Sequence, residues 1–219
     1  MIGVVVQARM GSTRLPGKVL LPIAGRPLLD HVVGRLSQLR NKVLIVVATT
    51  IASKDDVISE RCYGLGVECF RGSELDVLGR YVACARAHGF DHVVRLTADN
   101  PFTDIDELDR LIDQHLTESN DYTHSFGVMP LGVGAEIFTR AALERSGRDG
   151  RESNHREHVN EYVQENPHIF RIGRLDVPAA KRHPEISLTV DTVEDYDRAC
   201  RIADRAPDRW ISTLEALTP

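Results

Sequence analysis

The stretch IGVVVQARMGSTRLPGK (residues 2–18) combines two patterns that decide the fold. Residues 2–8 form a short β-branched run without a polar face, which is typical of a strand buried on both sides of a sheet. The run then gives way to glycine, small hydroxyl residues and basic residues. The stretch therefore predicts a buried strand, followed by a loop whose residue types are suited to ligand binding or catalysis.

Two further runs, LIVVATT (44–50) and HVVRLTA (92–98), repeat the strand pattern. Helical patterns lie at residues 26–39, 53–66, 73–89 and 104–116. Serine begins two of them, so we expect Ser53 and Ser73 to be N-caps. Strands that alternate with helices favour a mainly parallel sheet, in which ligands bind at the carboxyl ends of the strands. We therefore expect the loops that follow the first and third runs to face one crevice.

The pattern changes after residue 120. Residues 121–138 are rich in glycine and aromatic residues, as in strands with a hairpin-like excursion. Residues 139–147 and 155–166 have helical patterns. EISLTVDT (185–192) indicates one more strand, and the segment 193–206 indicates a helix after it.

These elements predict a single α/β domain over residues 1–219, with a mixed, mainly parallel sheet flanked by helices. Residues 121–180 are expected to form a small lobe inserted into it, for sugar binding and dimerisation. Within the lobe, SFGVMPLGVG (125–134) would be an exposed apolar arm that pairs two subunits into a homodimer.

The composition disfavours several classes of partner. The 219 residues carry a net charge of −5, which argues against nucleic acid and against a membrane surface. No run approaches the roughly 18 apolar residues that cross a bilayer, and no signal-peptide pattern is present. The cysteines are scattered without a C-x-x-C pair, which disfavours a zinc site and favours reduced thiols in a cytoplasmic protein. They are Cys62, Cys69, Cys84 and Cys200.

The loop after the first strand is not a P-loop. That motif needs four residues between its glycines, whereas five separate Gly11 from Gly17. Lys18 is followed by Val19, so no hydroxyl is placed to ligate Mg²⁺, and Pro16 removes one backbone donor. The dinucleotide pattern G-x-G-x-x-G is also absent.

The residue types of this loop still favour phosphate. Arginine offers a bidentate fork to phosphate oxygens, lysine a point charge, and glycine a close backbone approach. The alternative is a solvated basic turn without a ligand. The six residues concerned are Arg9, Gly11, Ser12, Thr13, Arg14 and Lys18.

Two aspartates follow other strand patterns and weaken that alternative. Asp99 comes after the run at 92–98, and Asp191 stands near the end of the run at 185–192. Mg²⁺ prefers one or two carboxylates together with phosphate oxygens and water. Each aspartate alone could be a helix N-cap, since Asp191 precedes a helical segment. Together with the basic loop they predict a site for phosphate and metal.

Several stretches resemble the cytidylyltransferases that activate acidic sugars, a family that includes acylneuraminate and 3-deoxy-manno-octulosonate cytidylyltransferases. Beside VVVQARMGSTRLPGKVL, the resemblance is carried by FRGSELDVLGRY (70–81), RLTADNPFTD (95–104), REHVNEYV (156–163) and SLTVDTVEDYDRA (187–199). It runs from about residue 2 to 205 and is strongest to the spore coat polysaccharide biosynthesis protein F branch. The resemblance implies a nucleotide-diphospho-sugar transferase (Rossmann-like) fold and a Mg²⁺-dependent reaction of CTP with an acidic sugar, giving CMP-sugar and pyrophosphate.

The resemblance also assigns roles by motif. The catalytic residues would be Arg9, Lys18, Asp99 and Asp191, with both aspartates as metal ligands. The nucleotide would be bound by Ala8, Arg9, Gly11, Ser12, Thr13, Arg14, Lys18, Arg71, Ser73 and Thr97. The sugar would be bound by Asn100, Glu136, Arg156 and His158.

Some positions depart from the family pattern and keep alternatives open. Ala98 replaces a usual glycine, and Thr97 replaces a glutamine of the octulosonate enzymes that faces the base. An enzyme of the same fold that uses GTP or dTTP therefore stays possible, as does a non-catalytic nucleotide-binding module. A glycosyltransferase would use a D-x-D metal motif, but the D-x-D at 104–106 opens a helix. His158 is a candidate base or a surface residue, and Arg156 could pair with a sugar carboxylate or on the surface.

Overall fold

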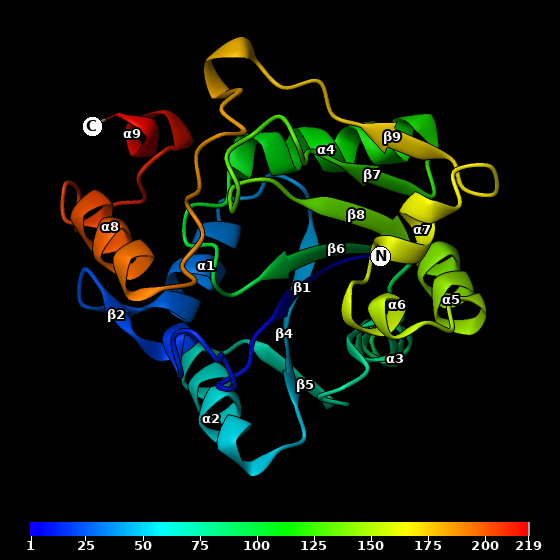
Figure 1. Cartoon of the computed structure of the whole chain (residues 1–219), viewed down its shortest axis with the longest axis horizontal. Coiled ribbons are helices and arrows are strands. Elements are labelled where there is room, and N and C mark those ends of the chain that lie inside the picture. Colours follow the sequence, from blue (N-terminus) through cyan, green and yellow to red (C-terminus); the bar gives the residue numbers. More distant parts are fainter. Residues whose placement is uncertain (219) are drawn as a thin grey trace.

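A computed structural model describes residues 1–218, and its main feature is one seven-stranded mixed sheet (Figure 1). The strand order is β5-β4-β1-β6-β8-β7-β9. The strands are β1 (Ile2–Gln7), β4 (Val43–Thr50), β5 (Glu68–Gly72), β6 (His92–Thr97), β7 (Tyr122–His124), β8 (Glu136–Thr139) and β9 (Ile172–Arg174). A separate ribbon pairs β2 (Pro22–Ile23) with β3 (Arg26–Pro27). The predicted fold class is confirmed.

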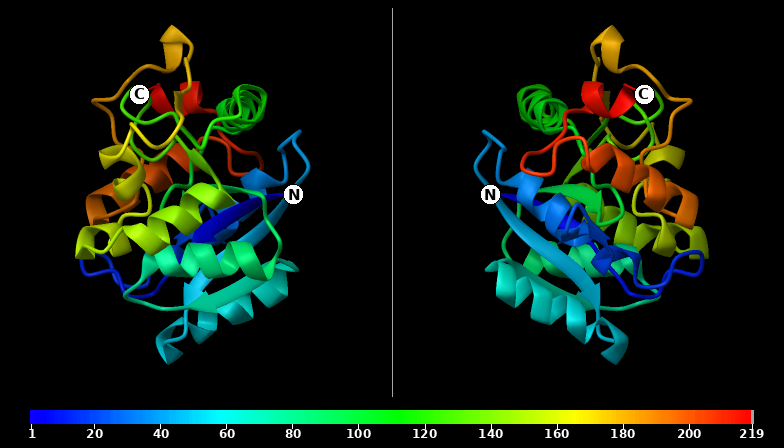
Figure 2. Two further views of the ribbon diagram at one scale, coloured as in Figure 1. Left: turned by 90° about the vertical axis from the view of Figure 1, so that its right-hand side faces the viewer. Right: turned by 90° about the vertical axis from the view of Figure 1, so that its left-hand side faces the viewer.

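Helices connect the strands and pack on both faces of the sheet (Figure 2). The longer ones are α1 (Leu28–Leu36), α2 (Asp56–Leu65), α3 (Val77–Ala87), α4 (Ile105–Glu118), α5 (Arg140–Asp149) and α8 (Val193–Ala203). Short ones are α6 (Ser153–Glu157), α7 (Glu161–Glu165) and α9 (Thr213–Leu217), and 3-10 turns cover η1 (Lys18–Leu20), η2 (Ser53–Asp55) and η3 (Ala179–Lys181).

Strand β1 lies at the centre and shows why both faces are apolar. Its side chains alternate between two core clusters, with Val4 and Val6 in one and Val5 in the other, and all three are fully buried. Residues of α1, α2 and α4 belong to the first cluster, and residues of α3 and α5 to the second. The strand therefore needs no polar face, as its sequence indicates.

The register of β1 and β6 positions the functional loops. The two strands are parallel, and Gln7 is paired with Thr97 at their carboxyl ends. The loops that begin at Ala8 and Ala98 therefore start side by side, and Ala98 N donates a hydrogen bond to the carbonyl of Gln7 over 2.8 Å. This confirms that the two loops meet at one edge of the sheet.

Residues 121–180 extend the main sheet. They supply β7, β8 and β9, which continue it beyond β6, and α5 packs on α3. The apolar arm expected at 125–134 is wrong. Met129 and Val133 are 3% and 1% exposed because they pack into the first core cluster, while Leu131 is exposed. The homodimer was predicted from this arm, so it stays a prediction without that support.

The strand expected at 185–192 is also wrong. This segment is extended, but it pairs with loops, through one isolated bridge between Ser187 and Leu131. Val190 N donates to the carbonyl of Asp99 over 2.9 Å, so the segment still reaches the loop after β6. The helix expected at 155–166 is interrupted, because His158 adopts an extended conformation between α6 and α7.

The expected serine caps are wrong, because acidic residues occupy the cap positions. Asp76 caps α3 by accepting a hydrogen bond from Gly79 N, and Ser73 accepts one from Asp76 N instead. Ser53 lies inside η2, and Asp55 precedes α2.

In residues 1–218 no helix has the length and apolar character needed to cross a membrane. The four cysteines are free thiols.

A buried carboxylate ties α4 to the turn between α1 and β4. Asp109 is 1% exposed and accepts hydrogen bonds from the backbone N–H groups of Arg40 and Asn41, both over 3.0 Å, and from Asn41 Nδ2 over 2.9 Å. Burial would raise the pKa of Asp109, but these hydrogen bonds outweigh it and lower the pKa. The ionised form is therefore the one that the fold stabilises.

We expect Asp109→Asn to lower the free energy of unfolding by about 1–3 kcal/mol at pH 7, because an amide NH₂ would face two N–H donors. The effect should be full above the unfolded pKa of about 3.9 and shrink as the pH falls through the lower folded pKa. Urea titrations from pH 3 to pH 7 measure it. Asp113→Asn is the control, since Asp113 is exposed and accepts one bond from Asn41. Equal effects in both variants would contradict this prediction.

Candidate functional site

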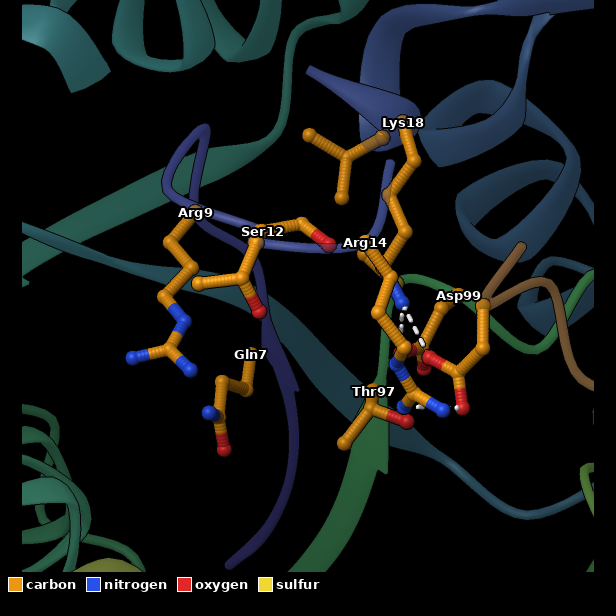
Figure 3. Close-up of a pocket in the computed structure, with 11 residues that line it drawn as sticks. Gln7, Arg9, Ser12, Arg14, Lys18, Thr97 and Asp99 are labelled. Atoms are coloured by element: carbon orange, nitrogen blue, oxygen red, sulfur yellow. Dashed lines mark hydrogen bonds and ion pairs between the residues drawn. The ribbon is translucent and has the colours of Figure 1, made fainter. Parts of the chain in front are cut away.

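A cavity of about 200 Å³ lies at the carboxyl ends of β1 and β6 (Figure 3). It is lined by Gln7, Arg9, Ser12, Thr13, Arg14, Lys18, Val19, Thr97, Ala98, Asp99 and Asp191. Eight of these residues were predicted as site residues from the sequence, and they come from segments as far apart as the first loop and the start of α8. The structure thus gathers the basic loop and both aspartates in one place.

The basic loop is held by its backbone, which leaves its side chains free to line the cavity. Met10 N donates to Asp55 Oδ1 over 2.7 Å, and Asp55 is fully buried. Gly17 N donates to the carbonyl of Met10 over 3.0 Å, which closes the loop. Gly17 has a φ of +71°, which glycine adopts without strain, and it turns the chain into η1. Lys18 therefore begins a 3-10 turn at the cavity wall.

Lys18 is the centre of the charge arrangement. Its Nζ donates to Asp99 Oδ2 over 2.6 Å, to Asp191 Oδ1 over 2.7 Å and to the carbonyl of Val190 over 2.8 Å. Only 7% of Lys18 is exposed, while about a quarter of each aspartate side chain is open to the cavity. An ammonium group thus already holds together the two carboxylates that chain sequence separates by 92 residues.

The two arginines of the loop differ in their pairing. Arg14 Nη2 forms an ion pair with Asp191 Oδ2 over 2.9 Å. Within residues 1–218 Arg9 forms no ion pair, and Figure 3 shows it on the side of the cavity away from Asp99. A guanidinium without an acidic partner, beside Ser12 and Thr13, is suited to bind an anion such as phosphate.

The oxygens that accept hydrogen bonds from Lys18 Nζ also fit as ligands of a divalent cation. Mg²⁺ prefers oxygen ligands, and two carboxylates match the one or two that accompany substrate phosphates. The ammonium of Lys18 occupies a cation position between the same oxygens. Asp99 and Asp191 therefore fit as metal ligands.

Other predicted nucleotide residues do not line the cavity. Arg71 sits on β5 and donates to the carbonyls of Thr50 and Ala52 over 2.8 and 2.9 Å, besides an ion pair with Asp56. Ser73 receives a hydrogen bond from Asp76 N over 3.0 Å. Arg71 therefore binds the connection between β4 and α2, Ser73 belongs to the segment between β5 and α3, and neither residue lines the cavity.

Three further predicted residues lie close to the cavity but do not line it. Ala8 is 1% exposed, and its N–H donates to the carbonyl of Ala48 over 3.2 Å. Gly11 lies beside the flexible end of Lys54, whose Nζ would be 2.9 Å from a Cβ at this position. Asn100 donates to Thr97 Oγ1 over 2.9 Å, and its own Oδ1 is buried without a partner in the described residues.

The other three predicted sugar residues do not line the cavity either. Glu136 is fully buried in β8 and forms an ion pair with Arg95 over 2.6 Å. Arg156 on α6 lies 3.6 Å from Asp76 of the α3 cap. His158 is the exposed residue that ends α6. Glu136 is enclosed and cannot touch a ligand directly in this arrangement.

Sequence reasoning missed Gln7, Val19 and Ala98 as lining residues. Gln7 carried a usable signal, because it is the one polar side chain at the end of an otherwise apolar strand. Its Oε1 is buried without a hydrogen-bond partner in residues 1–218. Val19 gave no such signal, since an apolar residue after a lysine is common in any turn.

The D-x-D triplet at 104–106 has a structural role. Asp104 caps α4 by accepting a hydrogen bond from Glu107 N over 3.0 Å. Its carboxylate also pairs with Lys181 Nζ over 2.8 Å and is 6% exposed. It does not line the cavity, which disfavours the glycosyltransferase alternative.

Comparison with known proteins gives one family. Residues 3–214 match the family model described as cytidylyltransferase. The spore coat polysaccharide biosynthesis protein SpsF of Bacillus subtilis (strain 168) is 38% identical over 220 residues, which cover 98% of this chain and 91% of that protein.

Solved structures agree with the sequence relatives. A cytidylyltransferase from Leptospira borgpetersenii serovar Hardjo-bovis (strain JB197) superposes with a TM-score of 0.93 at 32% identity, over 99% of this chain and 92% of that one. CMP:2-keto-3-deoxy-manno-octonic acid synthetase complexed with CTP superposes with a TM-score of 0.71 at 18% identity, over 93% and 98%. The second likeness is one of fold.

Proposed function

This chain belongs to the cytidylyltransferase family, and from that premise we propose that it transfers CMP from CTP to an acidic sugar and releases pyrophosphate. The observation that carries the proposal is the cavity that joins the basic loop to Asp99 and Asp191. A site for a triphosphate needs positively charged side chains and backbone groups that can approach the phosphates, and the loop offers both. A metal-assisted transfer needs paired carboxylates, which Lys18 already holds in place.

The loop residues would bind and orient the triphosphate. Arg9 has no acidic partner in the described chain, and its fork can receive two phosphate oxygens. Ser12 and Thr13 can donate hydroxyl hydrogen bonds from the same wall. Lys18 and Arg14 would add positive charge opposite Arg9, so that negative charge on the leaving pyrophosphate is stabilised from two sides.

The reaction forms one bond and breaks one. A hydroxyl oxygen of the acceptor attacks the α-phosphorus of CTP, the bond between that phosphorus and the pyrophosphate oxygen breaks, and the hydroxyl proton is released to solvent. Asp99 and Asp191 would hold Mg²⁺, which supplies positive charge to the phosphate oxygens when bound. The chain's own part is to align the two substrates, since phosphoryl transfer depends mainly on positioning and electrostatic stabilisation.

An acidic sugar is the acceptor that the relatives support. The name of the octonic acid synthetase specifies such a sugar. The name of the Bacillus protein assigns that protein to spore coat polysaccharide biosynthesis. In this chain Arg156 lies beside Asp76 at 3.6 Å, a loose pair that a sugar carboxylate could displace. We propose surface polysaccharide or glycan biosynthesis as the use of the product.

A pyrophosphate-release screen tests this function. CTP, ATP, GTP and dTTP are each combined with Mg²⁺ and a panel of acidic and neutral sugars, and released pyrophosphate is measured. We expect release with CTP and an acidic sugar. Preference for GTP or dTTP would assign another nucleotide to the same fold. CTP binding without release, with every sugar, would indicate a nucleotide-binding module without catalysis.

A further inference from the structure

One face of the main sheet changes from apolar to polar along its strands. Val93 of β6 and Phe138 of β8 are fully buried on the face that α3 and α5 cover. Two residues further along the same face, Arg95 is in register with Glu136, and Glu136 with His124 of β7. We call Arg95, Glu136 and His124 the polar row.

The polar row adjoins the cavity of the candidate site. Arg95 is two residues before Thr97 on β6, so their side chains share a face. Thr97 lines the cavity and is paired with Gln7, which also lines it. The polar row therefore lies on β6, β8 and β7, beside the ends of β1 and β6 that line the cavity, in the strand order that Figure 1 shows.

Glu136 holds the row together from inside. Its Oε1 accepts a hydrogen bond from Arg95 Nη1 over 2.6 Å, and its Oε2 accepts one from the Tyr122 hydroxyl over 2.6 Å. Gln164 Nε2 donates to the same hydroxyl over 3.3 Å. Glu136 is fully buried, whereas 18% of the Arg95 side chain is exposed. The carboxylate therefore fixes the guanidinium, and part of the Arg95 side chain stays exposed.

Three polar atoms along this surface have no hydrogen-bond partner in residues 1–218, although each is buried. They are Gln7 Oε1, Arg95 Nε and His124 Nδ1. The large majority of buried side-chain polar atoms in folded proteins are paired, so three unpaired atoms on adjoining strands point to a missing hydrogen-bonding partner. Burial lowers the pKa of His124, so its ring is neutral at pH 7.

We propose that the polar row binds the hydroxyl groups of the acceptor, with Arg95 and His124 in contact with the acceptor and Glu136 as a positioning residue that acts through Arg95. This inference rests on the proposed function. The opposite charges of Arg95 and Glu136 compensate each other, so the row suits neutral hydroxyl oxygens better than a second anion beside the triphosphate. The polar row therefore binds the hydroxyl-bearing part of the acceptor sugar and not its carboxylate.

His124→Phe tests the row without disturbing the charge pair. The ring stacks on Tyr122 with centroids 5.4 Å apart, and phenylalanine keeps that contact while removing both nitrogens. We expect KM for the acceptor to rise about tenfold, as for a lost hydrogen bond, while KM for CTP stays within about twofold. His168→Phe is the control, because His168 is exposed.

Arg95→Met combined with Glu136→Gln removes both charges together, so that neither stays buried alone. We expect KM for the acceptor to rise about 100-fold, with an unchanged melting-temperature shift on adding CTP. Glu136→Gln alone should raise the same KM by a smaller factor. Unchanged acceptor KM in His124→Phe and in the double variant overturns the inference, as does an equal rise in KM for CTP.

The proposed function can fail separately. If the wild type releases no pyrophosphate with any sugar, the row is judged by calorimetry of the same sugars against the CTP-loaded protein. Binding to the wild type that His124→Phe weakens about tenfold supports the row. Binding that both proteins share, or no binding to the wild type, overturns it.

Discussion

Asp99→Asn and Asp191→Asn should each lower turnover by more than about 100-fold, the range seen when an electrostatic contact to a transition state is lost. Each carboxylate is open to the cavity and lies within 2.7 Å of the Lys18 ammonium. Asparagine keeps the shape and one oxygen but removes the negative charge that a divalent cation requires. Steady-state pyrophosphate release at saturating CTP measures the effect.

Asp106→Asn is the matched control for these variants. Asp106 is the exposed second acid of the D-x-D triplet, and it does not line the cavity. Its replacement should leave turnover within about twofold, as for surface substitutions in general. Near-normal turnover in Asp99→Asn or Asp191→Asn would contradict the metal assignment. A large loss in Asp106→Asn would revive the D-x-D alternative.

Lys18→Met should lower turnover by about 100-fold to 1000-fold, because the loop loses the cation at the centre of the site. The variant also has a consequence without nucleotide. The ammonium and a divalent cation would contact the same oxygens of Asp99 and Asp191, so they compete. Removing the ammonium should therefore increase the rise in melting temperature that Mg²⁺ or Mn²⁺ causes.

Lys181→Met provides a matched comparison for Lys18→Met. Lys181 Nζ also lies between two carboxylates, at 2.8 Å from Asp104 and 3.1 Å from Glu107. Its loss should lower stability without changing turnover, since this pair belongs to the α4 cap. If Lys18→Met responds to Mg²⁺ no more than the wild type, the shared cation position is wrong.

Periodicity was enough to predict the parallel part of the sheet. The runs that became β1 and β4 are apolar on both faces for most of their length, and the run that became β6 is apolar apart from His92, Arg95 and Thr97. Such runs are typical of strands covered on both sides of a sheet. Parallel strands also place the loops after β1 and β6 at one edge. For this reason Lys18 and Asp99 could be placed together from sequence, although 81 positions separate them.

The same reasoning failed where tertiary contacts decide the structure. EISLTVDT has a strand pattern, but its neighbours are the loops around Leu131 and Asp99, so a ladder cannot form. The segment 125–134 was expected to be an exposed arm because it is rich in glycine and apolar residues. Its burial depends on a core position for Met129 that no local pattern encodes.

The sequence predicted the site best where charged residues follow parallel strands, because those loops meet at one edge of the sheet. It predicted the site least well where residues of neighbouring strands lie side by side. The family resemblance assigned Glu136 to the sugar, yet sequence could not show that Arg95 and Tyr122 hydrogen-bond to both of its carboxylate oxygens. Cross-strand register is set by the assembled sheet. Gln7 was passed over for the same reason, since its meaning depends on Thr97 beside it.

The most direct test of the central claim identifies the product. Wild-type protein is incubated with CTP, Mg²⁺ and the acidic sugar that releases most pyrophosphate, and the mixture is followed by phosphorus NMR and mass spectrometry. We predict one pyrophosphate for each phosphodiester that joins CMP to the sugar, and neither product with Asp99→Asn. Pyrophosphate accompanied by free CMP, or a product without the sugar, would contradict the account.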